Sequence, residues 1–449
     1  MVETISRWNS WLNNIIWGVP MIILLVGTGL LLTILTKGIQ FVHLPLALRE
    51  VLGKVTRHGG GKGNVTPFQA VATALASTVG VGNIAGVATA IYLGGPGAIF
   101  WLWVSGLFGM ATKFSEVVVA LYYREPDKKG IIRGGAMYTL KKGLGLPWLG
   151  TLFAFFAALA AFGIGNMVQA NSVADSLRSS FHVPAAITGG VLALLTGIVI
   201  IGGIKRIGEV TQILVPFMCL LYLGGGLIII LTHLAQLPKV FALIFKGAFS
   251  RTAALGGFAG SGVRQALRYG IARGLFSNEA GLGSAPIAHA AADTDHPARQ
   301  GLYGIFEVFV DTILVCTFTG LVVLVTGVWT SGKTGASLTA LAFETGLPGL
   351  WGDIIVTAGL VFFAFSTLLG WSYYGETSAV YLFGTKAAFP YRLLWIVFVY
   401  LGATGSLHLV WEIADNLNGL MAIPNLVSVL GSLTILLRLK KEFFEKYNY

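Results

Sequence analysis

Charged side chains are scarce in this sequence. Of its 449 residues only 11% are Asp, Glu, Lys or Arg, while 55% are hydrophobic. A soluble protein of this length needs more charge to cover its surface, so a soluble enzyme or binding protein is excluded. Several stretches of about 20 residues or more contain no charged side chain: 15–36, 148–174, 184–204, 354–375 and 417–437. Each can cross a hydrocarbon layer of ~30 Å as a helix, which predicts an all-α polytopic membrane protein.

Cysteine is also rare. The two cysteines, Cys219 and Cys316, both lie in apolar stretches, so the sequence predicts no disulfide framework. A cleavable secretion signal is not expected, because the stretch 15–36 is too long for a signal core and no small-residue cleavage site follows it. Glycine, by contrast, occurs 60 times, and small residues allow membrane helices to approach one another closely.

Basic residues outnumber acidic ones by 30 to 19, which gives a formal net charge of +11. We interpret this excess as a topological signal and expect no nucleic-acid partner, because the cations gather in loops. Eleven spans are predicted: 15–36, 67–92, 97–122, 148–176, 184–204, 207–231, 262–292, 301–328, 353–382, 390–406 and 412–437. Lys and Arg concentrate in the loops 37–66 and 123–147 and in the C-terminal tail, and positive charge stays on the cytoplasmic side. This predicts a multi-pass protein of the cell membrane, with its N-terminus outside and its C-terminus in the cytoplasm.

An internal repeat relates two of these spans. GNIAGVATA (82–90) aligns without gaps with SNEAGLGSA (277–285), and four of the paired residues are identical. The same offset of 195 residues brings the span 148–176 close to the span 353–382. Because five spans separate the two copies, the second copy enters the membrane from the opposite side. The repeat therefore predicts five plus five helices of inverted topology, with 15–36 as an extra N-terminal helix.

The expected boundaries follow from this repeat. They are an extra helix with a cytoplasmic loop over 1–66, a first five-helix repeat over 67–231, an external connecting segment over 232–253, a second repeat over 254–437 and a cytoplasmic tail over 438–449. No long linker or low-complexity tract divides the chain further.

The first copy, STVGVGNIAG (77–86), admits two other interpretations. Residues 80–85 have the G-x-G-x-x-A spacing of a dinucleotide-binding loop, which requires a preceding strand and an acidic residue about 20 positions later. No Asp or Glu lies between Glu50 and Glu116, so this interpretation is rejected. Residues 82–86 also match a G-x-x-x-G helix-packing motif, which stays an alternative. Matching glycine-rich interruptions in both halves favour two broken helices that form a binding site near the membrane midplane.

A broken membrane helix has free backbone groups that suit a zwitterion. N–H groups at one cut end suit a carboxylate, and carbonyls at the other suit an ammonium group or Na⁺. Small residues over 76–82 limit the size of the ligand, while Thr78 and Asn83 offer oxygens to an alkali cation. No nucleophile-and-base arrangement is evident, so we expect no enzyme and no cofactor, with Na⁺ as the coupling ion.

Two long motifs resemble those of a known family. STVGVGNIAGVATAIYLGGPGAIFWLW (77–103) and RGLFSNEAGLGSAPIAHAAA (273–292) resemble the signatures of the alanine or glycine:cation symporters, also called sodium:alanine symporters. The similarity runs over essentially the whole chain. It implies a LeuT-type fold and import of small neutral amino acids, alanine and glycine, by alternating access with Na⁺ or sometimes H⁺. A proton-coupled or exchange amino-acid transporter of the same fold is the alternative.

The resemblance also implies roles for individual residues. The amides of Val81 and Gly82 correspond to groups that bind the substrate carboxylate, and the Thr78 carbonyl and Asn83 side chain correspond to a first sodium site. A second sodium site corresponds to the carbonyls of Ala76, Val79 and Phe363 with the side chains of Ser366 and Thr367. The implied substrate-binding set is Thr78, Gly80, Val81, Gly82, Gln169, Gly274, Phe276, Asn278 and Trp371.

Several polar residues in the spans have structural alternatives. Gln169 and Asn171 can bond one helix to another, and the resemblance favours Gln169 as a substrate contact. Glu279 is expected to hold the broken helices together or, alternatively, to carry a proton. Lys113 and Glu116, three residues apart on a helix, are expected to neutralise one another.

Two further pairs complete the set. Glu307 and Asp311 are expected to face a polar cavity or an arginine, because two carboxylates four residues apart on a membrane helix are costly. Phe276 and Trp371 are either packing aromatics or the walls of a cavity sized for a methyl group.

Overall fold

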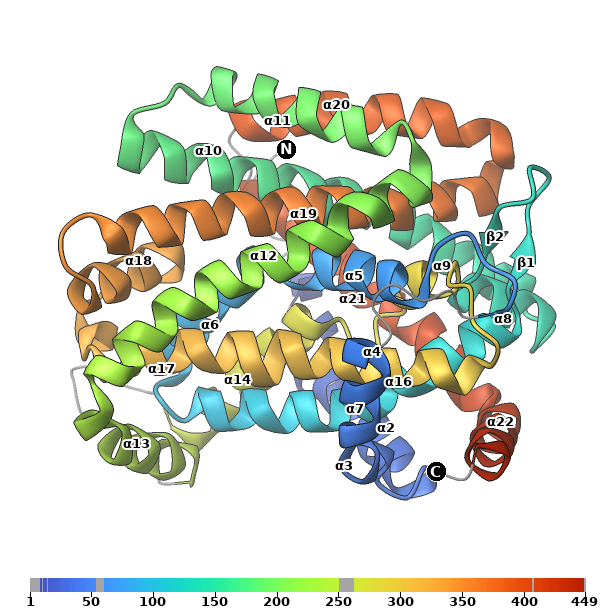
Figure 1. The fold of residues 1–449 in the computed structure, drawn as a ribbon, viewed down its shortest axis with the longest axis horizontal. Helices are drawn as coiled ribbons and strands as arrows, with labels where there is room; N and C mark the ends of the chain where they lie inside the picture. Colours follow the sequence, from blue (N-terminus) through green and yellow to red (C-terminus); the bar gives the residue numbers. More distant parts are fainter. Residues whose placement is uncertain are drawn as a thin grey trace.

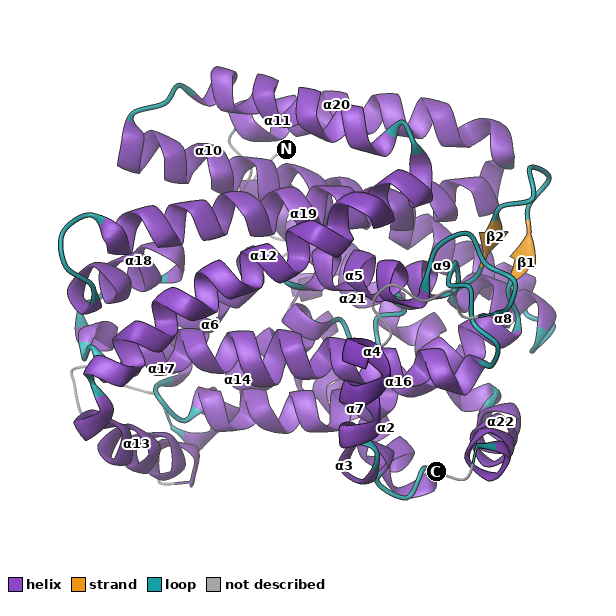
Figure 2. Ribbon diagram, viewed as in Figure 1, coloured by secondary structure: helices purple, strands orange, loops and turns teal. Residues whose placement is uncertain are grey.

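The computed structural model describes residues 9, 11–13, 15–53, 60–249, 262–405 and 408–447, and of residues 408–412 the backbone alone. Helices make up nearly all of this part of the chain (Figure 2). The two strands, β1 (Glu125–Pro126) and β2 (Ile132–Arg133), form a short antiparallel hairpin.

The helices of the first half are α2 (Val19–Leu35), α3 (Ile39–Val42), α4 (Leu44–Gly53), α5 (Pro67–Thr78), α6 (Val87–Gly94), α7 (Ala98–Tyr122), α8 (Ala136–Lys142), α9 (Pro147–Ala160), α10 (Val168–Phe181), α11 (Ala185–Ile200), α12 (Gly203–Thr232) and α13 (Leu237–Phe249). Those of the second half are α14 (Val263–Asn278), α15 (Pro286–His289), α16 (Pro297–Val308), α17 (Thr317–Val325), α18 (Gly335–Gly346), α19 (Trp351–Phe383), α20 (Ala388–Thr404), α21 (His408–Gly431) and α22 (Leu433–Lys446). The 3₁₀ turns are η3 (Leu234–Gln236), η5 (Val328–Thr330) and η6 (Thr385–Ala387).

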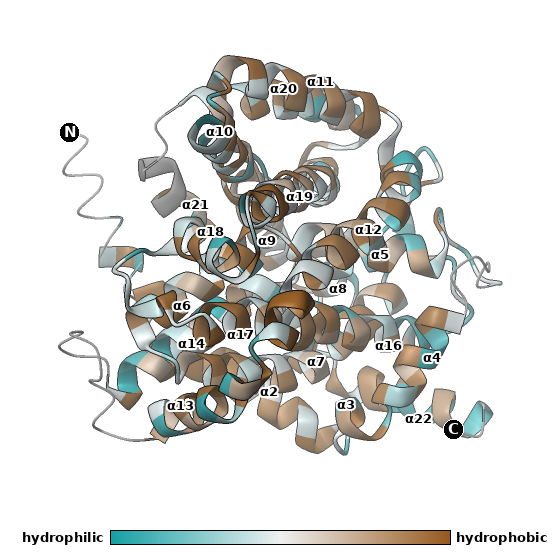
Figure 3. Cartoon of the chain, turned by 60° about the vertical axis from the view of Figure 1, so that its left-hand side comes forward, coloured by the Kyte–Doolittle hydropathy of each residue, from teal (hydrophilic) through white to brown (hydrophobic). Residues whose placement is uncertain are grey.

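The described helices include six that are long and apolar enough to cross a membrane, or up to eight if each of two bent pairs counts as one span. The bends are 50° between residues 67–78 and 82–94, and 60° between residues 413–431 and 433–446. α2 and α11 are also apolar but have only 17 and 16 residues. The outward faces of α11 and α20 are largely hydrophobic (Figure 3). The molecule is therefore a multi-pass helical membrane protein.

The two interrupted helices lie against different long helices (Figure 1). α5 contacts α19 and α12, while α14 contacts α7, and η1 (Gly82–Gly86) lies against α14. α16 also runs along α7, and α11 runs along α20 at the opposite side of the molecule. Residues from both halves of the sequence therefore meet around the two interruptions.

Three π-helical segments widen the helices near these interruptions: η1, η2 (Ala161–Met167) and η4 (Phe309–Cys316). Such segments are rare and occur often at functional sites. Asn83 lies in η1 and Asp311 in η4, and Gln169 follows two residues after the end of η2.

The fold has two ends that matter for the site. We call the end with the β1–β2 hairpin the hairpin end, and the end with α18 the α18 end; they lie on opposite sides of Figure 1. α19 runs between them, since Asp353 near its start and Glu376 near its end line different pockets.

Candidate functional site

The first interruption is built from a well-capped helix that stops at Thr78. Thr66 and Gln69 form a capping box that begins α5. The chain is extended at Val79, with φ −78° and ψ 90°, and the N–H of Gly80 donates to Oδ1 of Asn83 at 2.8 Å. The predicted break in this helix is confirmed, and the Asn83 side chain satisfies one of the backbone groups that the break exposes.

Gly80 lies close to two polar side chains. A Cβ atom on Gly80 would lie 2.7 Å from Oγ1 of Thr367 and 3.7 Å from Oε1 of Gln169. Oε1 of Gln169 is buried and accepts no hydrogen bond from the described residues, while its Nε2 donates to the Ile164 carbonyl at 2.9 Å. A buried acceptor without a donor is costly, so this oxygen is available to a ligand beside the break.

The second interruption follows Asn278, where α14 ends. Glu279, Gly281 and Gly283 have φ values of 55°, 93° and 81°, a left-handed region that glycine tolerates and other residues seldom adopt. Oδ1 of Asn278 accepts the N–H of Ala280 at 3.0 Å. The carboxylate of Glu279 accepts hydrogen bonds from the indole of Trp371, at 3.0 Å, and from the Ser284 hydroxyl. Glu279 therefore ties the second break to α19, whereas the expected role was to hold the two broken helices together.

α19 faces the first break with a cluster of oxygens. The Ser366 hydroxyl donates to the Ala76 carbonyl at 3.1 Å and to the Phe363 carbonyl at 2.8 Å. The Thr367 hydroxyl donates to the same Phe363 carbonyl at 2.9 Å. The structure thus brings together four of the residues expected at the second sodium site, and Val79 lies in the adjacent buried turn.

Asp311 connects the two breaks. Its side chain is fully buried, and its oxygens accept hydrogen bonds from Asn83 of η1 at 2.7 Å, from Ser277 of α14 at 2.9 Å and from Thr312 at 2.7 Å. No Lys or Arg of the described residues forms an ion pair with it, so the expected arginine partner is absent from this part of the chain. All its donors are neutral, and a buried carboxylate with neutral donors alone retains a large desolvation penalty.

Of the remaining predicted substrate residues, Gly274 and Phe276 lie on α14 and Trp371 lies on α19. Phe276 lies over Gly82, where a Cβ atom would lie 3.6 Å from its ring. Trp371 contacts η2, since a Cβ on Gly165 of that segment would lie 2.2 Å from the Cβ of Trp371. Gly274 lies against Ser105 of α7 at a distance that leaves no room for a side chain. The Asn171 side chain donates to the carbonyls of Gly402 on α20 and of Gly405 just after it. It therefore bonds one helix to another, which is one of the two roles expected for it.

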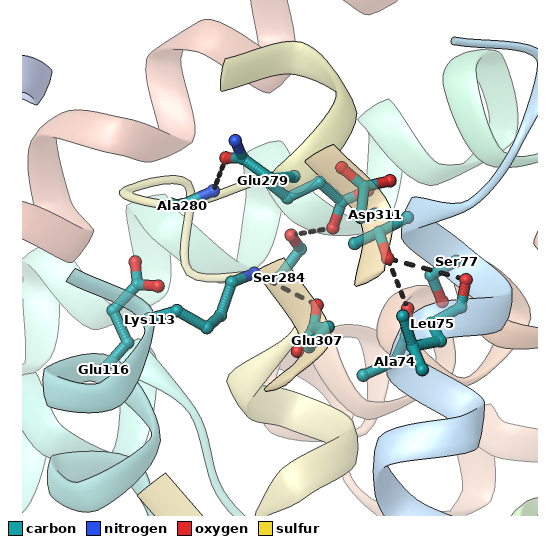
Figure 4. Close-up of polar contacts among 12 residues, drawn as sticks. Ala74, Leu75, Ser77, Lys113, Glu116, Glu279, Ala280, Ser284, Glu307 and Asp311 are labelled. Carbon is teal, nitrogen blue, oxygen red and sulfur yellow. Dashed lines mark hydrogen bonds and ion pairs between the residues drawn. The ribbon is translucent and has the colours of Figure 1, made fainter. Parts of the chain in front are cut away.

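The prediction that Lys113 and Glu116 neutralise one another is wrong. The Lys113 ammonium forms an ion pair with Glu307 of α16 at 3.3 Å (Figure 4). The other oxygen of Glu307 is 2.8 Å from Nε2 of His289. Oε1 of Glu116 instead accepts the N–H of Gly281 at 3.0 Å. Lys113 therefore pairs across the interface of α7 and α16 and not with the residue three positions along its own helix. A buried ion pair is favourable only with good geometry, and Glu307 supplies it.

A cavity of about 640 Å³ leads from the α18 end to the first break. Val81 and Ala85 line it together with residues of α10, α18 and α19. Its charged lining residues are Asp175, Lys333, Glu344 and Asp353. Carboxylates outnumber cations there, which favours entry of cations over anions.

An ion-pair network joins the hairpin to α19 and α20 at the hairpin end. Arg133 is 2% exposed, and its guanidinium contacts Asp127 at 2.8 Å and Glu376 at 3.1 Å. Arg392 of α20 contacts the same Glu376 at 2.7 Å. Burial opposes the ionisation of Asp127, but hydrogen bonds from Arg133 and from two backbone N–H groups outweigh it and lower the pKa of this carboxyl.

Replacing Arg133 with Gln is expected to loosen the hairpin end. The substitution leaves Asp127 unpaired and takes one partner from Glu376, and breaking a buried ion pair costs about 3–5 kcal/mol. Amide hydrogen exchange over residues 125–133 and 373–380 should become faster. Arg178→Gln is the matched control, because its ion pair with Asp175 has the same length, 2.8 Å, but is 65% and 56% exposed. Equal exchange in both variants would show that Arg133 does not close this end.

These features define a class of protein. A multi-pass helical protein with two interrupted helices that meet buried polar side chains has the architecture of a secondary transporter. The sequence model of the sodium:alanine symporter family matches residues 2–448, and the chain belongs to this family. It is accordingly a transporter and not an enzyme.

Individual relatives agree with this assignment. The sodium/alanine symporter AgcS of Methanococcus maripaludis is 53% identical over 426 residues, covering 93% of this chain and 92% of that protein. An uncharacterized transporter of Haemophilus influenzae is 48% identical over 445 residues, covering 99% and 97%. The amino-acid carrier protein AlsT of Bacillus subtilis is 38% identical over 428 residues, covering 94% and 90%.

Proposed function

We propose that this protein is a Na⁺-coupled symporter that imports small neutral amino acids, alanine and glycine, by alternating access. Its family and its identity to a protein named as a sodium/alanine symporter support the proposal. The observation that carries it is the environment of Asp311. A buried carboxylate bonded to both broken helices and without a Lys or Arg partner among the described residues requires a positive charge. A sodium ion among oxygen ligands supplies that charge.

The substrate would lie at the first break. The N–H groups of Val81 and Gly82, at the start of η1, would bind the carboxylate, because helix N-termini attract anions. The unpartnered Oε1 of Gln169 would accept a hydrogen bond from the ammonium group. Phe276 and Trp371 would restrict the side chain to a hydrogen or a methyl group.

Two sodium sites would flank the substrate. The first would use the Thr78 carbonyl and Asn83, extended by Asp311 and Ser277. The second would use the oxygens of Ala76, Val79, Phe363, Ser366 and Thr367. Oxygen ligands of this kind suit a hard monovalent cation. Gly80, Gly274 and Asn278 would shape the backbone around the substrate rather than donate to it.

The architecture we propose is the LeuT-type arrangement of eleven transmembrane helices, with α2 as the extra N-terminal helix and the repeat boundaries expected from the sequence. Asn83, just after the first break, and Asn278, just before the second, are 195 residues apart, which matches the offset of the sequence repeat and supports this architecture. The Lys and Arg residues of the hairpin end support a cytoplasmic location for that end and for the C-terminus. The cavity at the α18 end would then be the external entrance, closed on the cytoplasmic side by Arg133 and Glu376.

Uptake of labelled alanine into proteoliposomes tests the proposal. We expect uptake with an inward Na⁺ gradient and little uptake when choline replaces Na⁺. Thr367→Ala removes a hydroxyl from the second sodium site and should lower the apparent Na⁺ affinity by about 10–100-fold. Thr345→Ala is the matched control, because among the described residues this exposed threonine of α18 bonds only to its own helix, at the Leu341 carbonyl.

The other outcomes are equally informative. Uptake that ignores Na⁺ but follows a pH gradient would favour the proton-coupled transporter, and uptake that requires internal amino acid would favour the exchanger. Absence of alanine and glycine uptake under all gradients would contradict the substrate class.

A further inference from the structure

Four charged side chains form a buried cluster beside the second break. Lys113 and Glu116 of α7, Glu279 of the break and Glu307 of α16 are between 0% and 3% exposed (Figure 4). Lys113 is the cation that the three carboxylates share, and its ion pair is with Glu307. If all four groups were ionised, the cluster would carry a charge of −2, which is costly in a membrane interior.

His289 does not supply the missing charge. The side-chain amide of Gln300 lies 3.0 Å from Nδ1 of His289 and 3.3 Å from the Pro67 carbonyl. Because the amide donates to the carbonyl, it also donates to Nδ1, which must then be the acceptor nitrogen of the ring. The proton of His289 is therefore on Nε2, which donates to Glu307, and the imidazole is neutral.

The hydrogen bonds distinguish the three carboxylates. Glu307 has both Lys113 and His289 as partners, and Glu279 accepts from Trp371 and Ser284 on separate oxygens. Each oxygen of these two carboxylates therefore has a partner.

Glu116 is different. Its Oε1 accepts the N–H of Gly281 at 3.0 Å and the side-chain amide of Asn425 on α21. No donor of the described residues reaches Oε2, although this atom is buried. An ionised carboxylate with one bare oxygen in a buried, already negative cluster is the least stable of the three.

We propose that Glu116 is a proton-binding site, with the proton on Oε2 in this conformation. A metal ion is disfavoured there, because Na⁺ needs several oxygens and the neighbouring Lys113 ammonium repels it. In the neutral acid, Oε1 still accepts from Gly281 and Asn425 and so joins α7, the second break and α21. Loss of the proton adds a third ionised carboxylate to the cluster, which competes with Glu307 for Lys113. The charged groups that face Glu116 are therefore Lys113, Glu279 and Glu307.

The consequence for transport rests on the proposed function. The protonated form stabilises this conformation, so the proton is bound at low pH and released as the pH rises through the pKa of Glu116. Alanine uptake should fall on the alkaline side, by about tenfold for each pH unit above the midpoint. Glu116→Gln, which mimics the protonated acid, should remove this alkaline limb. Glu442→Gln on the exposed part of α22 should keep the wild-type profile.

Protonation can be measured without transport. In the purified wild-type protein, the infrared spectrum should contain the C=O stretch of a protonated carboxyl group, and this band should decline as the pH is raised. The spectrum of Glu116→Gln should lack this band. Glu116→Asp should shift this band and keep its pH dependence, which provides a second variant if the Gln protein folds poorly. A spectrum unchanged by Glu116→Gln would overturn the proton site whatever the uptake assay gives. A lost band with no transport in any variant would instead count against the proposed function.

Discussion

Asp311→Asn is expected to abolish Na⁺-dependent alanine uptake. The two side chains have the same shape, so the amide fills the space between Asn83 and Ser277 without a steric clash. What it removes is the negative charge that a sodium ion would neutralise. Removing a neighbour of a metal ligand typically costs 10–100-fold in affinity, so loss of a direct ligand should raise the Na⁺ requirement by at least about 100-fold. Uptake measured against Na⁺ concentration checks this.

The stability of the same variant separates a ligand from a structural carboxylate. Without Na⁺, Asp311→Asn should be as stable as the wild type or more so, because an uncompensated buried charge has been removed. With saturating Na⁺ the wild type alone should gain thermal stability. Asp311→Glu retains the charge and should keep some Na⁺ response, and Glu209→Gln, an exposed change on α12, should behave as wild type. A normal Na⁺ dependence in Asp311→Asn would remove the main support for the proposed function.

The membrane class and the two interruptions could be predicted from the sequence because they depend on local composition. Long uncharged stretches require a membrane, and glycine-rich segments at 80–82 and 281–283 mark where helical hydrogen bonds stop. The chain indeed leaves the helical path there, and the bend of 50° at the first break follows. Such signals lie within a few residues of the feature that they predict.

The partners of the buried charges could not be predicted in the same way. Asn83 and Asp311 are 228 residues apart, and Lys113 pairs with Glu307 rather than with its neighbour on the same helix. Sequence spacing describes one helix, whereas these contacts depend on how α7, α14 and α16 rotate against each other. The sequence does indicate that Asp311 is important, because an Asp within the apolar span 301–328 is costly and such residues are usually functional. It does not indicate which residues bond to it.

Gly165→Ala is expected to lower both stability and alanine uptake. The substitution changes no polar group and acts on the candidate site through packing alone. A Cβ on Gly165 would lie 2.2 Å from the Cβ and 2.4 Å from the Cγ of Trp371. These atoms are close to the backbone of α19 and cannot rotate away, so η2 and α19 must separate. Overpacking of this kind costs about 1–3 kcal/mol. The shift also moves the Trp371 indole from Glu279, and with it the contact that ties the second break to α19.

Thermal unfolding and alanine uptake of Gly165→Ala should therefore both decline. The matched control is Gly190→Ala on α11, where a Cβ atom meets nothing within 4 Å. There the same substitution should be neutral or slightly stabilising, since alanine favours a helix over glycine by about 1 kcal/mol.

The decisive comparison adds Trp371→Phe, which removes the indole N–H but keeps an aromatic ring. If Trp371→Phe transports normally while Gly165→Ala does not, the spacing of η2 and α19 matters and the hydrogen bond to Glu279 does not. If both fail to the same degree, that hydrogen bond links packing at Gly165 to the second break. Wild-type uptake in Gly165→Ala would contradict the close contact between η2 and α19.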